Sequence, residues 1–392
     1  MTQQGETPIR AAILGSGIIG RHHGEAMARL PRLRVDAVID AVPQAAQALA
    51  ALIASTRAAN GAPAGASADR AAADRAPAGA SADRAAADRA PAGASAAPGE
   101  PGCYESLGAA LADRELDLVV ICTPSGMHAG AAQEALAAGK HVVIEKPLDV
   151  SLDRARQVAE LATQAQKRGQ VCSVISQHRF DPASAAVYRA VAQGELGRIT
   201  SAVASVPWWR EQSYYDSAGW RGTKALDGGV TMNQAIHTID LLVWLLGEPV
   251  EVFAYTGLLA HERVEVEDVA VACVRFRSGA LAVLHASTAA YPGLAARLQI
   301  HGSRGSAIIQ DDQLEFLHVA GAPGGVNQAP PAEKEADGFL MGHVRQYQDI
   351  INAIDEGRAA AIGAQESLMS LAVVVGVYRS AQLGRPVRME EL

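Results

Sequence analysis

Short apolar runs alternate with stretches of helical periodicity over the first 147 residues. Continuous apolar runs are typical of strands buried on both faces, as in parallel sheets. Such runs lie at 9–14, 34–40, 116–124 and 141–147, with helical stretches at 21–30, 107–111 and 128–138 between them. Because strands and helices that alternate along a chain build doubly wound sheets, residues 1–147 are predicted to form one α/β domain around a parallel sheet.

The pattern changes in the second part of the chain. After a helix beginning at Ser151, a strand at 171–176 and a helix that begins at Asp181-Pro182, strand-like runs dominate. They lie at 198–206, 250–258, 268–277, 280–289, 296–301 and 305–310. Ser278-Gly279 between two runs predicts a hairpin, and two helices are expected around 341–356 and 365–382. Residues 148–392 are therefore predicted to form an α+β domain with a large, mainly antiparallel sheet and helices on one face.

A low-complexity insertion of about residues 55–101 interrupts the first domain. The unit APAGASADRAAADR occurs at 62–75 and again at 76–89, and half a third copy follows to residue 96. It holds almost no large apolar side chains and cannot bury enough surface to order a core. We interpret it as an inserted loop between the second helix and the third strand, and we interpret 320–336 as a second loop.

Composition narrows the function classes. The chain has 392 residues and a formal charge of −8, which predicts two domains and argues against nucleic acid or an anionic membrane as partner. No apolar run approaches the roughly 20 residues that a membrane span needs. The polar start MTQQGETPIR is unlike a secretory segment. The four cysteines lack metal-ligand spacing and are expected to be reduced thiols, so we predict a cytoplasmic protein without a bound metal.

The segment GSGIIG follows the first predicted strand. Gly15, Gly17 and Gly20, with Ile18 and Ile19 among them, match the spacing at which backbone approaches a dinucleotide pyrophosphate. Asp40 ends the second predicted strand, 20 positions beyond Gly20, where a carboxylate accepts from the ribose hydroxyls of NAD. No arginine follows it directly, which favours NAD over NADP. The alternative is an ordinary glycine-rich turn with a capping aspartate nearby.

Polar residues end the next two predicted strands. Thr123-Pro124 ends one, and Glu145-Lys146-Pro147 ends the other. Ligands of doubly wound sheets lie beyond the carboxyl ends of the strands, so these residues, with His128 at the start of the following helix, are candidate cofactor contacts. Only five of 34 basic residues are lysine. Lysine can lose its proton on burial whereas arginine cannot, so Lys146 is a candidate for proton chemistry. The alternative is a solvated sheet rim.

A second polar group precedes the apolar helix in DGGVTMNQAIHTIDLLVWLL. Asn233 and His237 are four residues apart and share a helix face. The alternative is a helix start with a satisfied core histidine. Upstream, aromatic and arginine side chains interleave, and either a sugar pocket or an aromatic subunit interface would explain them. The candidate substrate contacts are Arg179, Trp208, Arg210, Tyr214, Trp220, Arg221, Asn233 and His237.

In this order, GSGIIG, CTPSGMH, AGKHVVIEKPL and GGVTMNQAIHTIDLL resemble the glucose–fructose oxidoreductase/inositol dehydrogenase (Gfo/Idh/MocA) family. The tail GHVRQYQDIINAIDEGR resembles its closing helices, so the resemblance covers nearly the whole chain outside the repeats. It implies an N-terminal Rossmann domain that binds NAD(P). It also implies a second domain whose open sheet contacts a carbohydrate and joins subunits into a homodimer or homotetramer.

The resemblance also implies roles for single residues. Lys146 would bind the reacting hydroxyl, Glu145 would lie by the nicotinamide ribose and His237 would be the acid/base. It further implies a cis bond before Pro147. The chain departs from the commoner pattern at Asn233, where an aspartate is usual, and at Val230, where a third glycine is usual. Asparagine can orient a hydroxyl but cannot hold a proton, which leaves Lys146 and His237 to handle the proton.

The resulting hypothesis is an NAD-dependent dehydrogenase that oxidises a secondary hydroxyl, at C3, of a sugar, sugar acid, glycoside or nucleotide sugar. Two alternatives stay open. One is an enzyme that cleaves glycosides through transient oxidation by tightly held NAD. The other is a regulator that binds NAD and a sugar without turnover, since fold does not fix function.

Overall fold

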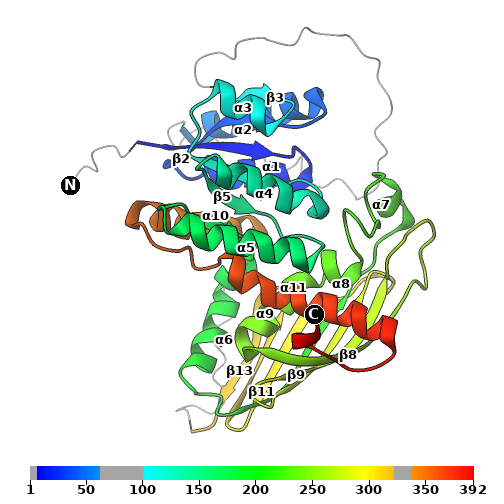
Figure 1. Cartoon of the computed structure of the whole chain (residues 1–392). Coiled ribbons are helices and arrows are strands. Elements are labelled where there is room, and N and C mark those ends of the chain that lie inside the picture. Colours follow the sequence, from blue (N-terminus) through cyan, green and yellow to red (C-terminus); the bar gives the residue numbers. More distant parts are fainter. Residues whose placement is uncertain (1–6, 62–99, 322–336) are drawn as a thin grey trace.

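The computed structural model describes residues 7–61, 100–321 and 337–392, which form two layered units (Figure 1). The first unit contains a six-stranded sheet in the order β3-β2-β1-β4-β5-β6, with all strands parallel. This is the dinucleotide-binding order and confirms the predicted doubly wound sheet. Its strands are β1 (Ile9–Leu14), β2 (Leu33–Ile39), β3 (Gly102–Tyr104), β4 (Leu118–Ile121), β5 (His141–Ile144) and β6 (Cys172–Val174).

Helices cover both faces of this sheet, which explains why most positions along its central strands are apolar. In β4, Leu118 and Val120 pack on one side, whereas Val119 and Ile121 pack on the other. The first side holds α1 (Ile18–Ala28), α2 (Pro43–Gly61) and α10 (Gly338–Glu356), and the second holds α3 (Leu107–Asp113), α4 (His128–Ala137) and α5 (Leu152–Gln166). Strand β6 and helix α10 therefore join this sheet from beyond residue 147. The repeat segment lies outside the described residues, between the end of α2 and the start of β3.

The second unit contains an eight-stranded sheet in the order β13-β12-β11-β7-β10-β9-β8-β14. Neighbouring strands are antiparallel except β7 and β10, which confirms the mainly antiparallel prediction. The predicted Ser278-Gly279 hairpin joins β9 to β10, with Gly279 at φ +87°. The strands are β7 (Ile199–Pro207), β8 (Pro249–Gly257), β9 (Val269–Phe276), β10 (Leu281–Ser287), β11 (Arg297–Gly302), β12 (Gly305–Gln310), β13 (Gln313–Val319) and β14 (Val387–Arg388).

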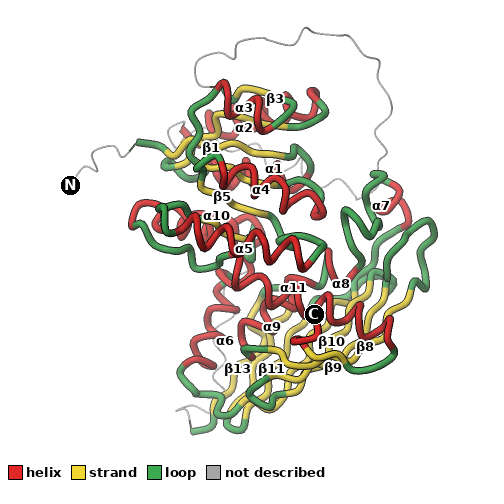
Figure 2. Tube along the Cα trace, viewed as in Figure 1, coloured by secondary structure: helices red, strands yellow, loops and turns green. Residues whose placement is uncertain are grey.

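Helices lie on one face of this second sheet (Figure 2). They are α6 (Pro182–Ala192), α8 (Val230–Asn233), α9 (Ile236–Leu246) and α11 (Ala364–Leu383), and a short helix, α7 (Gln212–Asp216), lies in the loop after β7. Helix α9 is buried nearly all round because the sheet covers one side and α11 the other. Helix α11 also packs on α5 and so ties the two units together. None of the described helices is long and apolar enough to cross a membrane.

Candidate active site

The glycine-rich turn after β1 is as tight as the sequence predicts. Gly15 has φ +103°, and a Cβ there would lie 2.5 Å from the Cys122 carbonyl oxygen. A Cβ on Gly20 would lie 2.1 Å from the Gly15 oxygen, so side chains are excluded at both positions. At Gly17, the residue that precedes α1, a Cβ would meet nothing within 4 Å. The turn is therefore closed toward the sheet and open where a phosphate would approach the helix N-terminus.

Residues around this turn fit a dinucleotide. The Asp40 carboxylate accepts from the Ser16 and Val42 main-chain N–H groups, at 2.8 and 2.9 Å, which holds it beside the glycines. Ile18 and Val42 are 70% and 54% exposed, although isoleucine and valine side chains are usually buried. The Ser16 and Thr123 hydroxyls are buried without a hydrogen-bond partner in the described part of the chain. Exposed apolar side chains and unpaired hydroxyls around one turn are features that a bound NAD would complete.

His128 joins the ends of β4 and β5. Its Nδ1 lies 2.7 Å from the Pro147 carbonyl oxygen and its Nε2 2.8 Å from that of Thr123. Burial lowers the pKa of this imidazole. The Lys146–Pro147 bond is cis, as the resemblance implied. His128 thus holds together the two polar strand ends that the sequence singles out, Thr123-Pro124 and Glu145-Lys146-Pro147.

Glu145 points into the protein. Its Oε1 lies 2.8 Å from His23 Nε2 and 3.7 Å from His343 Nε2, and its Oε2 accepts from the Lys146 main-chain N–H at 3.0 Å. The opposite nitrogen of His23 meets the Tyr347 hydroxyl at 2.6 Å. Burial alone would raise the pKa of Glu145, but the two imidazoles hold it well below its usual value. The carboxylate is engaged by α1 and α10, and it fixes the backbone that carries Lys146.

The ammonium group of Lys146 reaches across to the second unit. Its Nζ donates to the main-chain oxygen of Asn233, at the end of α8, at 2.8 Å. Burial lowers the pKa of Lys146, whereas the charges of Glu145 and Asp227 oppose that change. The Asn233 side chain donates through Nδ2 to the Asp227 carboxylate. The structure thus brings the predicted lysine and asparagine into contact from two different units.

His237 lies one turn beyond Asn233. Burial, and then the positive charges of Lys146 and His178, place the pKa of His237 well below 6.5. The His178 ring packs edge-on against it with centroids 5.0 Å apart. His178 Nδ1 lies 2.8 Å from Asp181 and 3.0 Å from Asp312. Burial opposes charge on His178, yet these two carboxylates outweigh it and raise its pKa to about 10.

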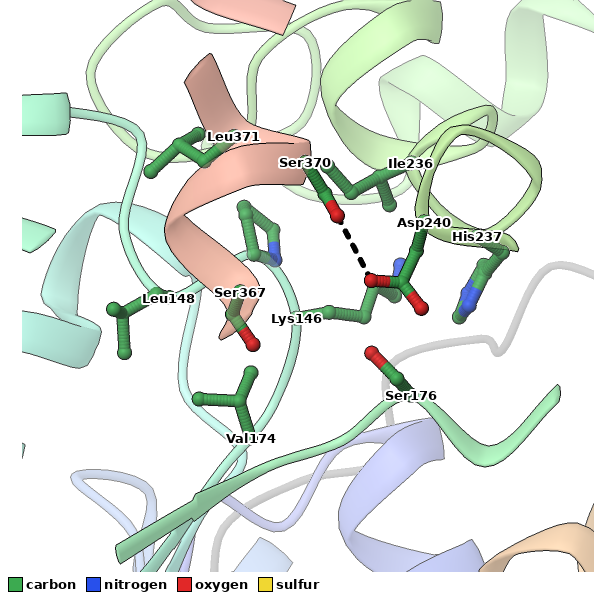
Figure 3. A pocket seen from close by; sticks show the side chains of 11 residues that line it. Lys146, Leu148, Val174, Ser176, Ile236, His237, Asp240, Ser367, Ser370 and Leu371 are labelled. Atoms are coloured by element: carbon green, nitrogen blue, oxygen red, sulfur yellow. Dashed lines mark hydrogen bonds between the residues drawn. The ribbon is translucent and has the colours of Figure 1, made fainter. Parts of the chain in front are cut away.

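Lys146 and His237 both line a small cavity between the two units (Figure 3). Its volume is about 20 Å³, which is room for roughly one water molecule and not for a sugar. Asp240, Ser367 and Ser370 line the same cavity, and Ser370 donates to Asp240 at 2.8 Å. The cavity therefore adjoins the two predicted catalytic side chains without being large enough to hold the substrate.

The interleaved aromatic and arginine side chains form one cluster. The Arg221 guanidinium lies 4.5 Å from the ring centroids of Tyr214 and Trp220, and it donates to the Tyr214 hydroxyl at 2.9 Å. Arg210 lies 5.3 Å from the ring of Trp208 and 5.4 Å from that of Tyr214. Gln234, directly after Asn233, donates to the same hydroxyl at 3.3 Å. The cluster therefore adjoins the helix that carries Asn233.

Arg179 is paired with another side chain. Its Nε and a terminal nitrogen donate to the two oxygens of Asp240 at 2.7 and 2.6 Å, and both side chains are buried. A bidentate guanidinium–carboxylate pair satisfies both charges where leaving one alone would be costly. Arg179 thus contacts α9 through Asp240, which lines the cavity, and its charge is already balanced.

Sequence reasoning missed Asp227 and the glycine pair after it. Asp227 is 1% exposed and contacts Asn233. Gly228 has φ +78°, and a Cβ on Gly229 would lie 1.9 Å from Oε2 of Glu267. The other oxygen of this carboxylate, Oε1, accepts from the Thr231 N–H at 2.9 Å. The motif DGG before a polar helix start was the available signal, because two adjacent glycines there indicate a crowded turn.

The fold and this site define an NAD-binding oxidoreductase with a Rossmann domain. The model of the oxidoreductase family with an NAD-binding Rossmann fold matches residues 9–174, and that of the GFO/IDH/MocA C-terminal domain matches residues 184–308. The chain belongs to the Gfo/Idh/MocA oxidoreductase family, as the sequence motifs indicated.

Similar proteins act on polyols and sugars. Inositol 2-dehydrogenase of Rhizobium meliloti is 29% identical over 97% of this chain and 98% of its own length. The WlbA dehydrogenase of Bordetella pertussis, solved with NADH and UDP-GlcNAcA, is 29% identical, with 98% of each chain covered and a TM-score of 0.76. Levoglucosan dehydrogenase with NADH shares the fold, with a TM-score of 0.79 at 20% identity and coverage of 98% and 99%.

Proposed function

We propose that this enzyme oxidises the C3 hydroxyl of a sugar acid, free or linked to a nucleotide, with NAD as hydride acceptor. The observation that carries the proposal is the meeting of Lys146 with the α8–α9 segment that bears Asn233 and His237. The adjoining arginine–aromatic cluster offers flat faces for a pyranose ring and guanidinium groups for a carboxylate. A similar protein solved with a nucleotide-linked uronate supports this substrate class.

The proposed chemistry assigns one task to each side chain. NAD supplies the hydride acceptor. The Lys146 ammonium donates a hydrogen bond to the substrate oxygen and stabilises the negative charge that develops there. Because its pKa is lowered, His237 is a neutral imidazole at neutral pH and can take the hydroxyl proton. Asn233 accepts a hydrogen bond from a neighbouring hydroxyl and so orients the ring.

A substrate panel tests this function. The purified enzyme is incubated with NAD or NADP and with UDP-GlcNAcA, free uronates, myo-inositol, levoglucosan and glycosides, and formation of reduced nicotinamide is followed by absorbance. We expect turnover with NAD, fastest for a uronate, and product analysis that shows a 3-keto group. Tight NAD binding without formation of reduced nicotinamide from any of these compounds would instead indicate a sugar-binding regulator. Release of free aglycone without net formation of NADH would indicate glycoside cleavage.

We further propose that the enzyme is a homodimer or homotetramer joined through the second sheet. The face of this sheet opposite the helices exposes apolar side chains on three adjacent strands, with Tyr255 68% and Leu281 52% exposed beside Val271 and Val283. Neighbouring apolar side chains on one face are typical of subunit interfaces. Sedimentation equilibrium should give two or four subunits. A monomer at micromolar concentration would contradict this proposal.

A further inference from the structure

Asp227 and Asn233 are linked through their side chains at the entry to α8. One oxygen of the Asp227 carboxylate accepts from the Gly222 main-chain N–H at 2.7 Å, and the other accepts from Asn233 Nδ2. Gly222 directly follows Arg221 of the aromatic cluster, so Asp227 fixes both the loop that carries this cluster and the amide of Asn233. Its carboxylate is buried and is distinct from the two proposed catalytic groups, the Lys146 ammonium and the His237 imidazole.

This contact determines which atom Asn233 presents. A carboxylate can only accept, so it selects the NH₂ group of the amide. The amide oxygen is then the group that Asn233 offers on its other side, while its main-chain oxygen accepts from Lys146 Nζ at 2.8 Å. Asn233 therefore connects the buried carboxylate to the ammonium group.

Resting on the proposed function, we propose that Asp227 is a positioning residue for hydride transfer and that Asp227 and Asn233 act as one unit. The carboxylate holds the amide so that its oxygen accepts from a substrate hydroxyl beside Lys146. The unit replaces the single aspartate that is commoner at position 233 in the resembling sequences. The negative charge is retained, but it lies one side chain further from the substrate.

The charges around the unit agree with this role. Lys146 faces Glu145, which precedes it in the segment after β5, Asp227 across the site and His237 on α9. Asp227 also faces Arg221. Burial raises the pKa of Asp227, and the Gly222 N–H, the Asn233 amide, Arg221 and Lys146 all oppose that rise. Loss of the Asp227 charge would remove one of the two anions that favour the ammonium form of Lys146.

The pair can be exchanged without losing its hydrogen bonds. An asparagine at position 227 can accept from Gly222 through its oxygen and donate through its NH₂ to an aspartate at position 233. The exchange moves the carboxylate to the helix and the amide to the turn. Either change alone breaks the pattern, because Asn233→Asp sets two carboxylates against each other and Asp227→Ala leaves the Gly222 donor and the Asn233 amide without their acceptor.

The test compares Asp227→Ala, Asp227→Asn, Asn233→Asp and the exchanged variant with the unmodified enzyme on its best panel substrate. We expect Asp227→Ala and Asn233→Asp each to lose about 10²-fold in kcat, the size of loss that misplaced reacting groups cause. The exchanged variant should recover to within about tenfold of the unmodified enzyme, as a pair that acts as a unit requires. In Asp227→Asn the alkaline limb of kcat/KM should move to lower pH, because Lys146 loses a neighbouring anion.

Controls separate positioning from folding. NAD affinity and the melting temperature are measured for every variant, and Asp216→Asn, an exposed acid in the same loop, should keep full activity. If the unmodified enzyme turns over but the exchanged variant does not recover, or Asp227→Ala keeps the original rate, the proposal that Asp227 and Asn233 act as one unit is wrong. The proposed function is not affected by that result. Absence of turnover with every substrate contradicts the proposed function and, with it, the role of the pair.

Discussion

Replacement of Lys146 by alanine is expected to lower kcat by about 10⁴-fold while the affinity for NAD stays unchanged. The side chain is the cation that the first unit extends to the α8 end, and burial weakens the competition of water for the groups it binds. Its loss removes both the donor to the substrate oxygen and the positive charge beside the developing alkoxide. Steady-state turnover and a fluorescence titration with NAD measure the two quantities.

Two further lysine variants separate the role of the Lys146 side chain from the loss of a positive charge. Lys167→Ala, at an exposed position after α5, controls for loss of one positive charge and should keep full activity. Lys146→Arg keeps the positive charge but cannot lose a proton, so its kcat should exceed that of Lys146→Ala by less than about tenfold. A Lys146→Ala enzyme that retained the original turnover would remove the lysine from the mechanism.

His237→Ala is expected to lower kcat/KM by about 10³-fold through the loss of the base. The pKa of His237 lies well below 6.5, chiefly because of burial and then because of the charges of Lys146 and His178. An imidazole with a lowered pKa stays neutral above that pKa. In the unmodified enzyme the acid limb of kcat/KM should therefore lie below pH 6.5 and disappear in His237→Ala.

The pH profile also reports the neighbours of His237. His178→Gln removes one cation beside His237, which should raise the pKa of His237 and move the acid limb to higher pH. The shift should be partial, because burial still lowers this pKa and Lys146, His343 and Glu145 still act on the ring. His301→Ala, on a β11 strand of the second sheet, is the matched control and should leave the profile unchanged. If His237→Ala kept both its rate and its acid limb, another group would have to be the base.

Local sequence patterns predicted those parts of the molecule that depend on short-range order. The strand–helix alternation, the glycine turn and the position of Asp40 follow from residues close together in the chain. Lys146 and Asn233 are 87 positions apart, and only the family motifs connected them before the structure did. The patterns also separated the antiparallel second sheet, because its strands alternate between a covered and an open face.

Contacts between distant segments could not be derived from the sequence. The partner of Arg179 is Asp240, 61 positions away, and nothing local distinguishes that arginine from one that faces a sugar. Glu145 turns inward because His23, 122 positions earlier, and His343 of α10 converge on it. Asp227 is close to Asn233 in the sequence, yet their contact depends on the conformation of the crowded glycine turn between them.

The return of α10 to the first sheet makes the nucleotide-binding half discontinuous in the chain. Tyr347 of this helix is fully buried and closes the hydrogen-bonded chain that runs through His23 to Glu145. A fragment that stopped after β6 would leave Ile13, Met27 and their neighbours without the apolar cover that Leu340 and Ile350 provide. The core of the first sheet is consequently built from two separated parts of the chain, and a truncation that removed α10 is expected to destabilise it.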